Sequence, residues 1–327
     1  MVSRYKGQVI ASNSRRQIAM RIAIVAPGAV GGYFGVLLAR SGENVAALAR
    51  GAHLEAIAEH GLIAEGPRGT FSARLDASDD AARLGTADIV LFAVKLYGAA
   101  EAARSAAPLF GAQTLGISLL NGVDGHEIMG RELPGRTVVG GSAYVSAVIA
   151  APGKLRYTSD MSAITFGAPA DAALRARATA FIDSCRKAGF KADMVDDVMS
   201  SLWEKFIGLS TNAALTTAAR LPAGALYGDP DVVEVARALM QEAAAVARAA
   251  GAKLPDDIVE RSMTILSRFP AGMYASMYHD YAKGGPIEIE GMSGYVVREG
   301  RRLSVPTPHH ATIYALLKPH RAGTPGT

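Results

Sequence analysis

The sequence is poor in cysteine and in aromatic side chains. Its 327 residues include one cysteine, Cys185, and one tryptophan, and Phe, Trp and Tyr together make up 6%. A single cysteine excludes an intramolecular disulfide and any cysteine-rich metal site, so a reducing, cytoplasmic setting is the simplest expectation. Cys185 falls in an expected helix and is interpreted as a core residue. With 20% charged residues, 35 glycines and 15 prolines, the composition also excludes coiled-coil and collagen-like chains.

An uncharged run of 18 residues, Ile22 to Ala39, reaches the length of a membrane-spanning helix. It follows the pair Arg15-Arg16, which is typical of a twin-arginine export signal. The run is nevertheless interrupted by turn-forming residues, namely Pro27, Gly28, Gly31, Gly32 and Gly35. These residues divide it into a strand, a turn and a helix, so we expect neither a membrane span nor export.

Acidic residues are absent from residues 1–19, which carry Arg4, Lys6, Arg15 and Arg16. The whole chain has 34 basic and 30 acidic residues, a net charge of +4 and a pI near 9.1. Without the first 19 residues the body is neutral, so the basic pI does not indicate a nucleic-acid partner. We interpret residues 1–19 as a flexible basic extension and residues 321–327 as a short tail.

From Arg21 onward, strand-like and helix-like segments alternate, a pattern typical of an α/β domain with a parallel sheet. The expected strands are 22–26, 44–49, 88–94, 115–120, 138–149, 154–158, 163–167 and 191–195. The three from 138 to 167 are predicted to be antiparallel and to complete the sheet. Beyond Asp196 only helical patterns occur, at 199–219, 231–250, 256–268, 292–299 and 308–318. We therefore predict a dinucleotide-binding domain over 20–196 and a helical domain over 197–320, with the site in the cleft between them.

The loop after the first strand resembles the G-x-G-x-x-G fingerprint at its second and third glycines, Gly28 and Gly31. Gly28 would let the backbone approach a pyrophosphate, Gly31 would let the helix pack closely on the strand, and the helix start at Ala29 and Val30 would supply amides. Pro27 removes one amide donor, so the turn must differ locally. This loop is predicted to bind the cofactor.

Further candidates follow the ends of other expected strands. Arg50 stands where an NAD site would carry an acid, and an arginine there can hold the 2′-phosphate of NADP, so NADP is the favoured cofactor. Lys95 and Asn121 come directly after two strands, and the carboxyl ends of parallel strands line the ligand crevice.

In the helical region, Lys205 stands among apolar residues, and Ser276 and Glu288 lie in a later polar segment. A Lys205–Glu288 pair is a plausible acid site, although the spacing does not show that the two residues meet. The histidines lack metal-ligand spacing, so we expect no metal site and interpret them as surface or loop residues: His279, His309 and His310.

Together these segments resemble the ketopantoate reductases (2-dehydropantoate 2-reductases) over residues 20–318. The matching motifs, in order, are GAVGGYFG (28–35), FAVKLY (92–97), LLNGVDG (119–125), LWEKF (202–206), SMYHD (276–280) and PIEIEGMSG (286–294). The resemblance implies an N-terminal Rossmann domain and an all-α C-terminal domain similar to that of 6-phosphogluconate dehydrogenase.

The resemblance also implies NADPH-dependent reduction of 2-dehydropantoate to pantoate. By motif position, Lys205 would donate the proton and Glu288 would be its partner near cofactor and substrate. Ser276 would bind the substrate carboxylate, and Lys95 and Asn121 would lie at the nicotinamide end. An ammonium beside the carbonyl suits this chemistry because negative charge builds on oxygen as hydride arrives.

The sequence departs from the family at three asparagine positions, which here are Leu209, Ala213 and Ala223. Asn212 lies on nearly the same helix face as Lys205 and is a candidate replacement. The alternatives left open are a more apolar 2-oxo acid as substrate, or an NADP-binding sensor without catalysis. The apolar stripes of 231–250 and 308–318 are either ordinary core or homodimer contacts.

Overall fold

Within residues 19–324, which the computed structural model describes, the main sheet of the N-terminal domain has eight strands. The predicted basic extension, apart from Ala19, lies outside the described residues, as do 325–327. From edge to edge the strands are β12 (Lys191–Val195), β11 (Ala163–Gly167), β8 (Thr137–Tyr144), β7 (Phe110–Ser118), β6 (Ala87–Phe92), β1 (Arg21–Val25), β2 (Asn44–Leu48) and β5 (Asp76–Ser78). Among these strands only β8 and β11 pair antiparallel, which confirms the predicted parallel sheet.

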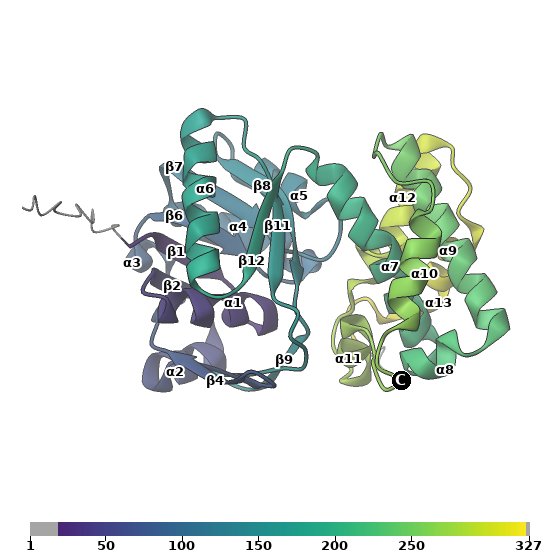
Figure 1. The fold of residues 1–327 in the computed structure, drawn as a ribbon, viewed down its shortest axis with the longest axis horizontal. Helices are drawn as coiled ribbons and strands as arrows, with labels where there is room; N and C mark the ends of the chain where they lie inside the picture. The colour runs from purple at the N-terminus through teal and green to yellow at the C-terminus, as the bar shows by residue number, and fades with distance from the viewer. Residues whose placement is uncertain (1–18, 325–327) are drawn as a thin grey trace, which may run out of the picture.

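Helices cover both faces of this sheet. One face packs on α1 (Ala29–Arg40) and α6 (Ala172–Lys187), and the other on α3 (Ala81–Leu84), α4 (Ala99–Ala106) and α5 (Gly125–Glu132). Figure 1 shows α6 in front of the sheet with α4 and α5 behind it. Cys185 is fully buried in α6, and burial raises the pKa of its thiol far above the ordinary value, so its interpretation as a core residue is confirmed.

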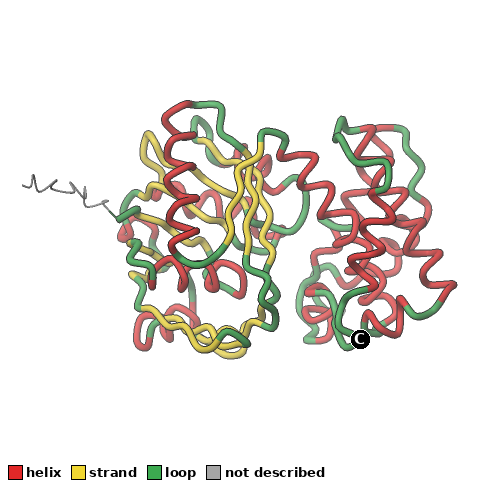
Figure 2. The backbone as a smooth tube through the Cα atoms, viewed as in Figure 1, coloured by secondary structure: helices red, strands yellow, loops and turns green. Residues whose placement is uncertain are grey.

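A second, smaller sheet lies beside the main one and corrects the prediction for residues 147–157. It consists of β4 (Gly69–Ala73), β3 (Leu62–Gly66), β10 (Lys154–Tyr157) and β9 (Ala147–Ala151), in that order. Figure 2 shows it as a twisted ribbon at the lower edge of the domain, near α2 (Gly51–His60). Residues 147–157 leave the main sheet because β3 provides a pairing partner and α1 provides a surface, where Tyr157 packs 5.4 Å from the Tyr33 ring. Such long-range partners are invisible to periodicity along the chain.

The C-terminal domain is helical throughout its described residues, as predicted. Its helices are α7 (Val198–Ala219), α8 (Ala223–Tyr227), α9 (Pro230–Ala249), α10 (Ile258–Ser267), α11 (Ser276–Ala282), α12 (Ser293–Leu303) and α13 (Pro308–Leu317). Capping residues mark the start of two of these helices. Asp197 accepts a hydrogen bond from Ser200 N at the start of α7, and Asp229 caps α9, which has Pro230 in its first turn. No helix in the described part of the chain is long and apolar enough to cross a membrane.

The prediction that all three histidines lie on the surface or in loops is wrong for His310. His279 and His309 are exposed, but the His310 side chain is buried where α13 packs on α9. Its Nε2 donates to the Leu239 carbonyl at 3.0 Å, and its Nδ1 bonds Ser293 Oγ at 3.2 Å. Burial lowers the pKa of His310 to about 4, so the ring is neutral near pH 7. Its two partners come from other helices, which is why local sequence did not indicate the burial.

Candidate active site

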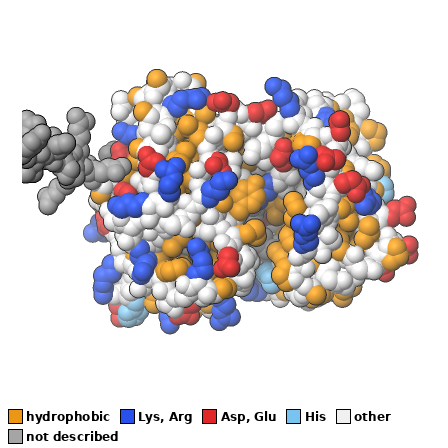
Figure 3. All heavy atoms as spheres, in the orientation of Figure 1, with side chains coloured by type: hydrophobic (Ala, Val, Ile, Leu, Met, Phe, Trp, Pro, Cys, Tyr) orange, Lys and Arg blue, Asp and Glu red, His pale blue; other side chains and the backbone are white. Residues whose placement is uncertain are grey.

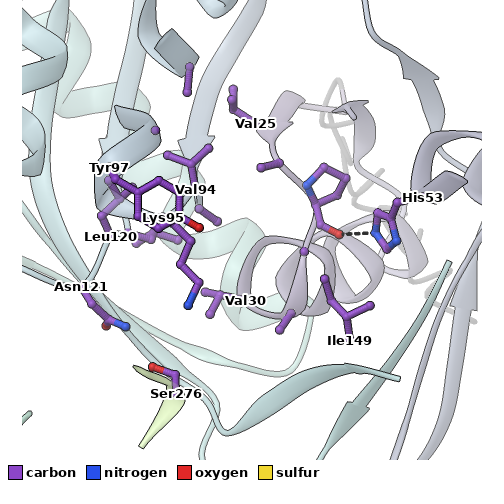
Figure 4. Close-up of a pocket in the computed structure, with 18 of the residues that line it drawn as sticks. Val25, Val30, His53, Val94, Lys95, Tyr97, Leu120, Asn121, Ile149 and Ser276 are labelled. Atoms are coloured by element: carbon purple, nitrogen blue, oxygen red, sulfur yellow. Dashed lines mark hydrogen bonds between the residues drawn. The ribbon is translucent and has the colours of Figure 1, made fainter. Parts of the chain in front are cut away.

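A cavity of about 610 Å³ lies between the two domains, as the sequence predicted. Its walls come from the loops after β1, β2, β6 and β7, from β9, and from α11 and the turn at Glu288. Figure 3 shows a hollow between the domains with hydrophobic side chains on either side of it. In the view of Figure 4, Asn121 and Ser276 lie at one end of the cavity and His53 at the other. We call this space the interdomain cavity.

The loop between β1 and α1 forms one wall of the interdomain cavity. Ala26, at the position of the missing first glycine, takes the left-handed conformation with φ of 60°, and its carbonyl accepts a hydrogen bond from Gly28 N at 2.7 Å. A Cβ on Gly31 would lie 2.8 Å from Ala93 Cβ, so the helix approaches the sheet as closely as the fingerprint requires. Gly28, Ala29 and Val30 line the cavity, and α1 has no side-chain cap, so its first amides suit a pyrophosphate.

Arg50 lies at the far end of β2 and lines the same cavity. Its Nη1 donates to Glu101 Oε1 at 2.6 Å and its Nη2 donates to Ser105 Oγ at 3.2 Å, both on α4. The hydrogen bond from Arg50 holds the pKa of the exposed Glu101 carboxyl below its usual value. The arginine is therefore at the predicted place, but it has an acidic neighbour that the sequence did not indicate.

Lys95, Asp280 and Glu288 form a group that joins the two domains. Lys95 Nζ lies 2.6 Å from Asp280 Oδ2 and 3.3 Å from Glu288 Oε2. Glu288 is buried, and its Oε1 also accepts the backbone N–H of Leu96 at 2.9 Å. Burial by itself would lower the pKa of Lys95, but Glu288 and Asp280 more than offset it, so the pKa is raised and the ammonium stays charged.

Lys205 projects from α7 to the other side of the site. Its Nζ donates to Ala143 O at 2.9 Å and to Asn121 Oδ1 at 3.3 Å, and lies 5.3 Å from the centre of the Tyr144 ring. These bonds use two of the three ammonium hydrogens. Burial lowers the pKa of Lys205 to about 8, against the opposing effect of the Glu288 charge. Asn121 lines the interdomain cavity, so the ammonium is one hydrogen bond away from its wall.

The predicted Lys205–Glu288 pair is not in direct contact. Neither a hydrogen bond nor an ion pair joins the two side chains, both of which the structure describes, and Glu288 instead contacts Lys95. Glu288 still acts on Lys205 through its charge. The two lysines therefore occupy different surroundings: one is neutralised by carboxylates, and the other is held by neutral oxygen atoms.

Ser276 begins α11 and lines the cavity, but Asn212 does not lie where it was predicted. Asn212 is 3% exposed, and its Oδ1 accepts a hydrogen bond from Tyr227 OH at 2.9 Å. Although Lys205 and Asn212 share a face of α7, they are about two turns apart, and α8 covers the second position. The role of Asn212 as a substrate ligand is therefore corrected to a contact within the helical core.

Several residues that line the cavity were not singled out from sequence: His53, Tyr97, Glu101 and Asp280. Asp280 stands in the SMYHD motif, four residues after Ser276, and this position was an available signal. Tyr97 ends the FAVKLY motif, two residues after Lys95, and this position was a second signal. His53 and Glu101 had no local signal, because their place in the cavity depends on the tertiary packing of α2 and α4.

Two family models match the chain. The model described as "Ketopantoate reductase PanE/ApbA" matches residues 22–171, and the model of the C-terminal region of the same family matches residues 197–321. The chain belongs to the ketopantoate reductase family. Its parallel-sheet domain followed by a helical domain is the fold of that family's solved structures.

Relatives of the ketopantoate reductase family align along nearly the whole chain. A 2-dehydropantoate 2-reductase of Mesorhizobium japonicum is 30% identical, over 91% of this chain and 97% of the relative. The crystal structure of a PanE/ApbA family ketopantoate reductase from Ralstonia eutropha JMP134 is 32% identical, with a TM-score of 0.84 over 91% of this chain and 97% of the other. A D-mandelate dehydrogenase structure with NADH and anilino(oxo)acetate shares the fold at 23% identity, with a TM-score of 0.84 over the same shares.

As a ketopantoate reductase family member, the chain is an NAD(P)-dependent oxidoreductase that acts on a CH–OH group. The class of reaction is the reduction of a 2-oxo acid. The interdomain cavity, with the α1 amides at one wall, Lys95 in its lining and Lys205 hydrogen-bonded behind Asn121, is the candidate active site for that reaction.

Proposed function

We propose that the chain reduces a 2-oxo acid with an apolar side chain to the 2-hydroxy acid, using NADPH and the proton of Lys205. The observation that carries this proposal is the Lys205 ammonium, held 3.3 Å from Asn121 at the end of a cavity whose opposite end presents the α1 amides. The Lys205 ammonium can supply a proton at its end of the cavity, and the α1 amides can hold a pyrophosphate at the opposite end.

The residues that would hold the cofactor span the cavity. The first amides of α1, at Ala29 and Val30, would bind the pyrophosphate. Gly28, whose own N–H donates to Ala26 O, would let the backbone approach it, and Gly31 lets α1 pack closely on the sheet. Arg50 would bind the 2′-phosphate, and Lys95 and Asn121 would border the nicotinamide end, with Glu288 holding Lys95 in place. When bound, the reduced nicotinamide supplies a hydride to the carbonyl carbon of the substrate.

Lys205 performs the other half of the reaction. Its ammonium can hydrogen-bond the carbonyl oxygen with its third hydrogen, stabilise the negative charge that develops there and then transfer the proton. Its lowered pKa, about 8, makes this transfer easier than it would be from an exposed lysine. Ser276, from the helical domain, would bind the substrate carboxylate through its hydroxyl.

The substrate side chain is proposed to be apolar because the amide positions of the family are Leu209, Ala213 and Ala223 here. Ala213 and Ala223 are buried and apolar, and the amide oxygen of the buried Asn212, which does not line the cavity, is engaged by Tyr227. An apolar pocket rejects an added hydroxyl by about 100-fold.

A steady-state assay with a panel of 2-oxo acids tests the proposed substrate class. We expect 3-methyl-2-oxobutanoate or phenylglyoxylate to exceed 2-dehydropantoate in kcat/KM by about 10- to 100-fold. The matched variant Leu209→Asn/Ala213→Asn should narrow that ratio. Fastest turnover of 2-dehydropantoate would contradict the apolar substrate, and tight NADPH binding without any turnover would favour the non-catalytic sensor.

Cofactor preference gives a second test. Arg50→Ala should raise the KM for NADPH about tenfold and leave the KM for NADH nearly unchanged, because a charge-assisted bond to a phosphate is lost. Glu101→Gln should act in the opposite direction, since it removes an anion 2.6 Å from Arg50 that competes with the 2′-phosphate. Arg104→Ala, on α4 and paired with Glu132, is the control. An unchanged NADPH to NADH ratio in Arg50→Ala would exclude Arg50 from the site.

A further inference from the structure

His53 makes two hydrogen bonds to backbone groups of segments that lie far apart in sequence. Its Nε2 lies 2.9 Å from the carbonyl oxygen of Pro27, in the loop before α1, and its Nδ1 lies 3.1 Å from the backbone nitrogen of Gly153, in the turn between β9 and β10. Figure 4 shows the first of these bonds, with His53 on one side of the loop and Ile149 nearby. The histidine thus connects α2, the loop after β1 and the second sheet.

The two partners determine the tautomer of the His53 ring. The Gly153 N–H can only donate, so Nδ1 must present its lone pair, and the ring proton must then be on Nε2. That proton is donated to the Pro27 carbonyl, which can only accept. The ring is therefore neutral, with both nitrogens used, and a side chain that only donates or only accepts cannot replace it.

The bond to Pro27 orients the peptide that leads into α1. The carbonyl side of the Pro27–Gly28 peptide is held by His53, and its N–H side is held by the Ala26 carbonyl at 2.7 Å. With both sides bonded, the plane of this peptide cannot rotate freely. The free first-turn amides of α1 follow directly from it, so their direction is set before any ligand arrives.

The bond to Gly153 holds the opposite wall. Val148 and Ile149 on β9 line the interdomain cavity and are 40% and 48% exposed. Ile149 Cδ1 would lie 3.6 Å from a Cβ on Gly28, so this apolar wall stands directly against the loop. Because β9 is the edge strand of its sheet, it is paired on one side only, and the bond from Gly153 to His53 adds a second attachment for the hairpin.

We propose that His53 is a positioning residue for the pyrophosphate of the cofactor. It touches the loop and the hairpin rather than the reacting atoms, and it keeps the α1 amides and the β9 wall at the spacing that the bound pyrophosphate needs. Such preorganisation strengthens binding because the ordering of the loop is completed before the ligand binds. The inference rests on the NAD(P) dependence of the proposed function.

Direct titration of NADP⁺ and NAD⁺ onto the full chain tests this role. His53→Gln and His53→Asn can each retain one of the two hydrogen bonds and should raise the Kd about threefold to tenfold, because one lost hydrogen bond contributes about 0.5 to 1.5 kcal/mol. His53→Ala loses both bonds and should raise the Kd more. The factor should be the same for both nucleotides, since both carry the pyrophosphate. With saturating cofactor, kcat should stay within about twofold of the wild type. His60→Gln, on the exposed end of α2, is the matched control.

The outcomes separate this role from others. An unchanged Kd in all three His53 variants, with the wild type binding normally, would overturn the role of His53 alone. A loss confined to NADP⁺ would also overturn it, by placing His53 at the 2′-phosphate instead of the pyrophosphate. Failure of the wild type to bind either nucleotide would overturn the cofactor assignment and this role together.

Discussion

Replacing Lys205 with alanine is expected to lower kcat by about 100- to 10,000-fold, the contribution of a positioned general acid. The affinity for NADP⁺ should change by less than about threefold, because the ammonium contacts Asn121 and Ala143 rather than the phosphate-binding loop. Single-turnover rates and nucleotide titration measure the two quantities separately. Lys253→Ala, an exposed lysine of the same domain, is the control.

The pH dependence distinguishes a proton donor from a merely structural lysine. Lys205 must be charged to donate, and burial lowers its pKa to about 8, so kcat for reduction should fall as the pH rises through that value. Lys205→Arg keeps the charge and should remove this fall, at a lower plateau, because the guanidinium does not release its proton in this range. If Lys205→Ala retained kcat within about threefold, the assignment of Lys205 as proton donor would be wrong.

Replacing Glu288 with alanine is expected to lower kcat/KM by about 10- to 100-fold, because Lys95 loses one of its two carboxylate partners and a hydrogen bond between charged groups contributes about 1.5 to 3 kcal/mol. The N–H of Leu96 would remain buried without its partner, and Lys95 would keep only Asp280. The N-terminal and helical domains would thereby lose a direct connection beside the nicotinamide end. The free energy of unfolding should also fall by about 2 kcal/mol, measured by urea denaturation.

Conservative and neighbouring variants define what Glu288 contributes. Glu288→Gln keeps an acceptor for Leu96 N–H but loses the charge beside Lys95, so it should lie between the wild type and alanine in both measurements. Glu290→Gln is the control, because that side chain pairs with Arg298 and Tyr314 away from the cavity. If Glu288→Ala had the kinetics and stability of the wild type, the proposed connection of the two domains through this carboxylate would be contradicted.

Local pattern was sufficient to locate the elements that bear the site. Strands 88–94 and 115–120 were recognisable because buried parallel strands are apolar throughout. Lys95 and Asn121 were site candidates because they directly follow the carboxyl ends of these two strands. The helix around Lys205 and the α9 boundaries followed from capping and from helical spacing. These features depend on residues only a few positions apart, so they can be recognised without knowing the tertiary structure.

The second sheet and the arrangement of charges were decided only by tertiary packing. The sequence of residues 147–157 is compatible with strands in either sheet. Pairing with β3 and packing on α1, about 90 and 120 residues earlier, decide that these residues belong to the second sheet. Lys95 contacts Asp280 and Glu288, which are 185 and 193 positions away, so sequence could name these groups without showing which lysine Glu288 would neutralise.

The composition, the order of the two domains and the positions of Lys95, Asn121, Lys205, Ser276 and Glu288 were thus available from the chain itself, whereas strands β3, β4 and β5 were not predicted. Their distances, and with them the lowered pKa of Lys205 and the raised pKa of Lys95, required the fold. The physical reason is that a charge responds to burial and to neighbours within a few ångströms, and those neighbours come from segments that only folding brings together.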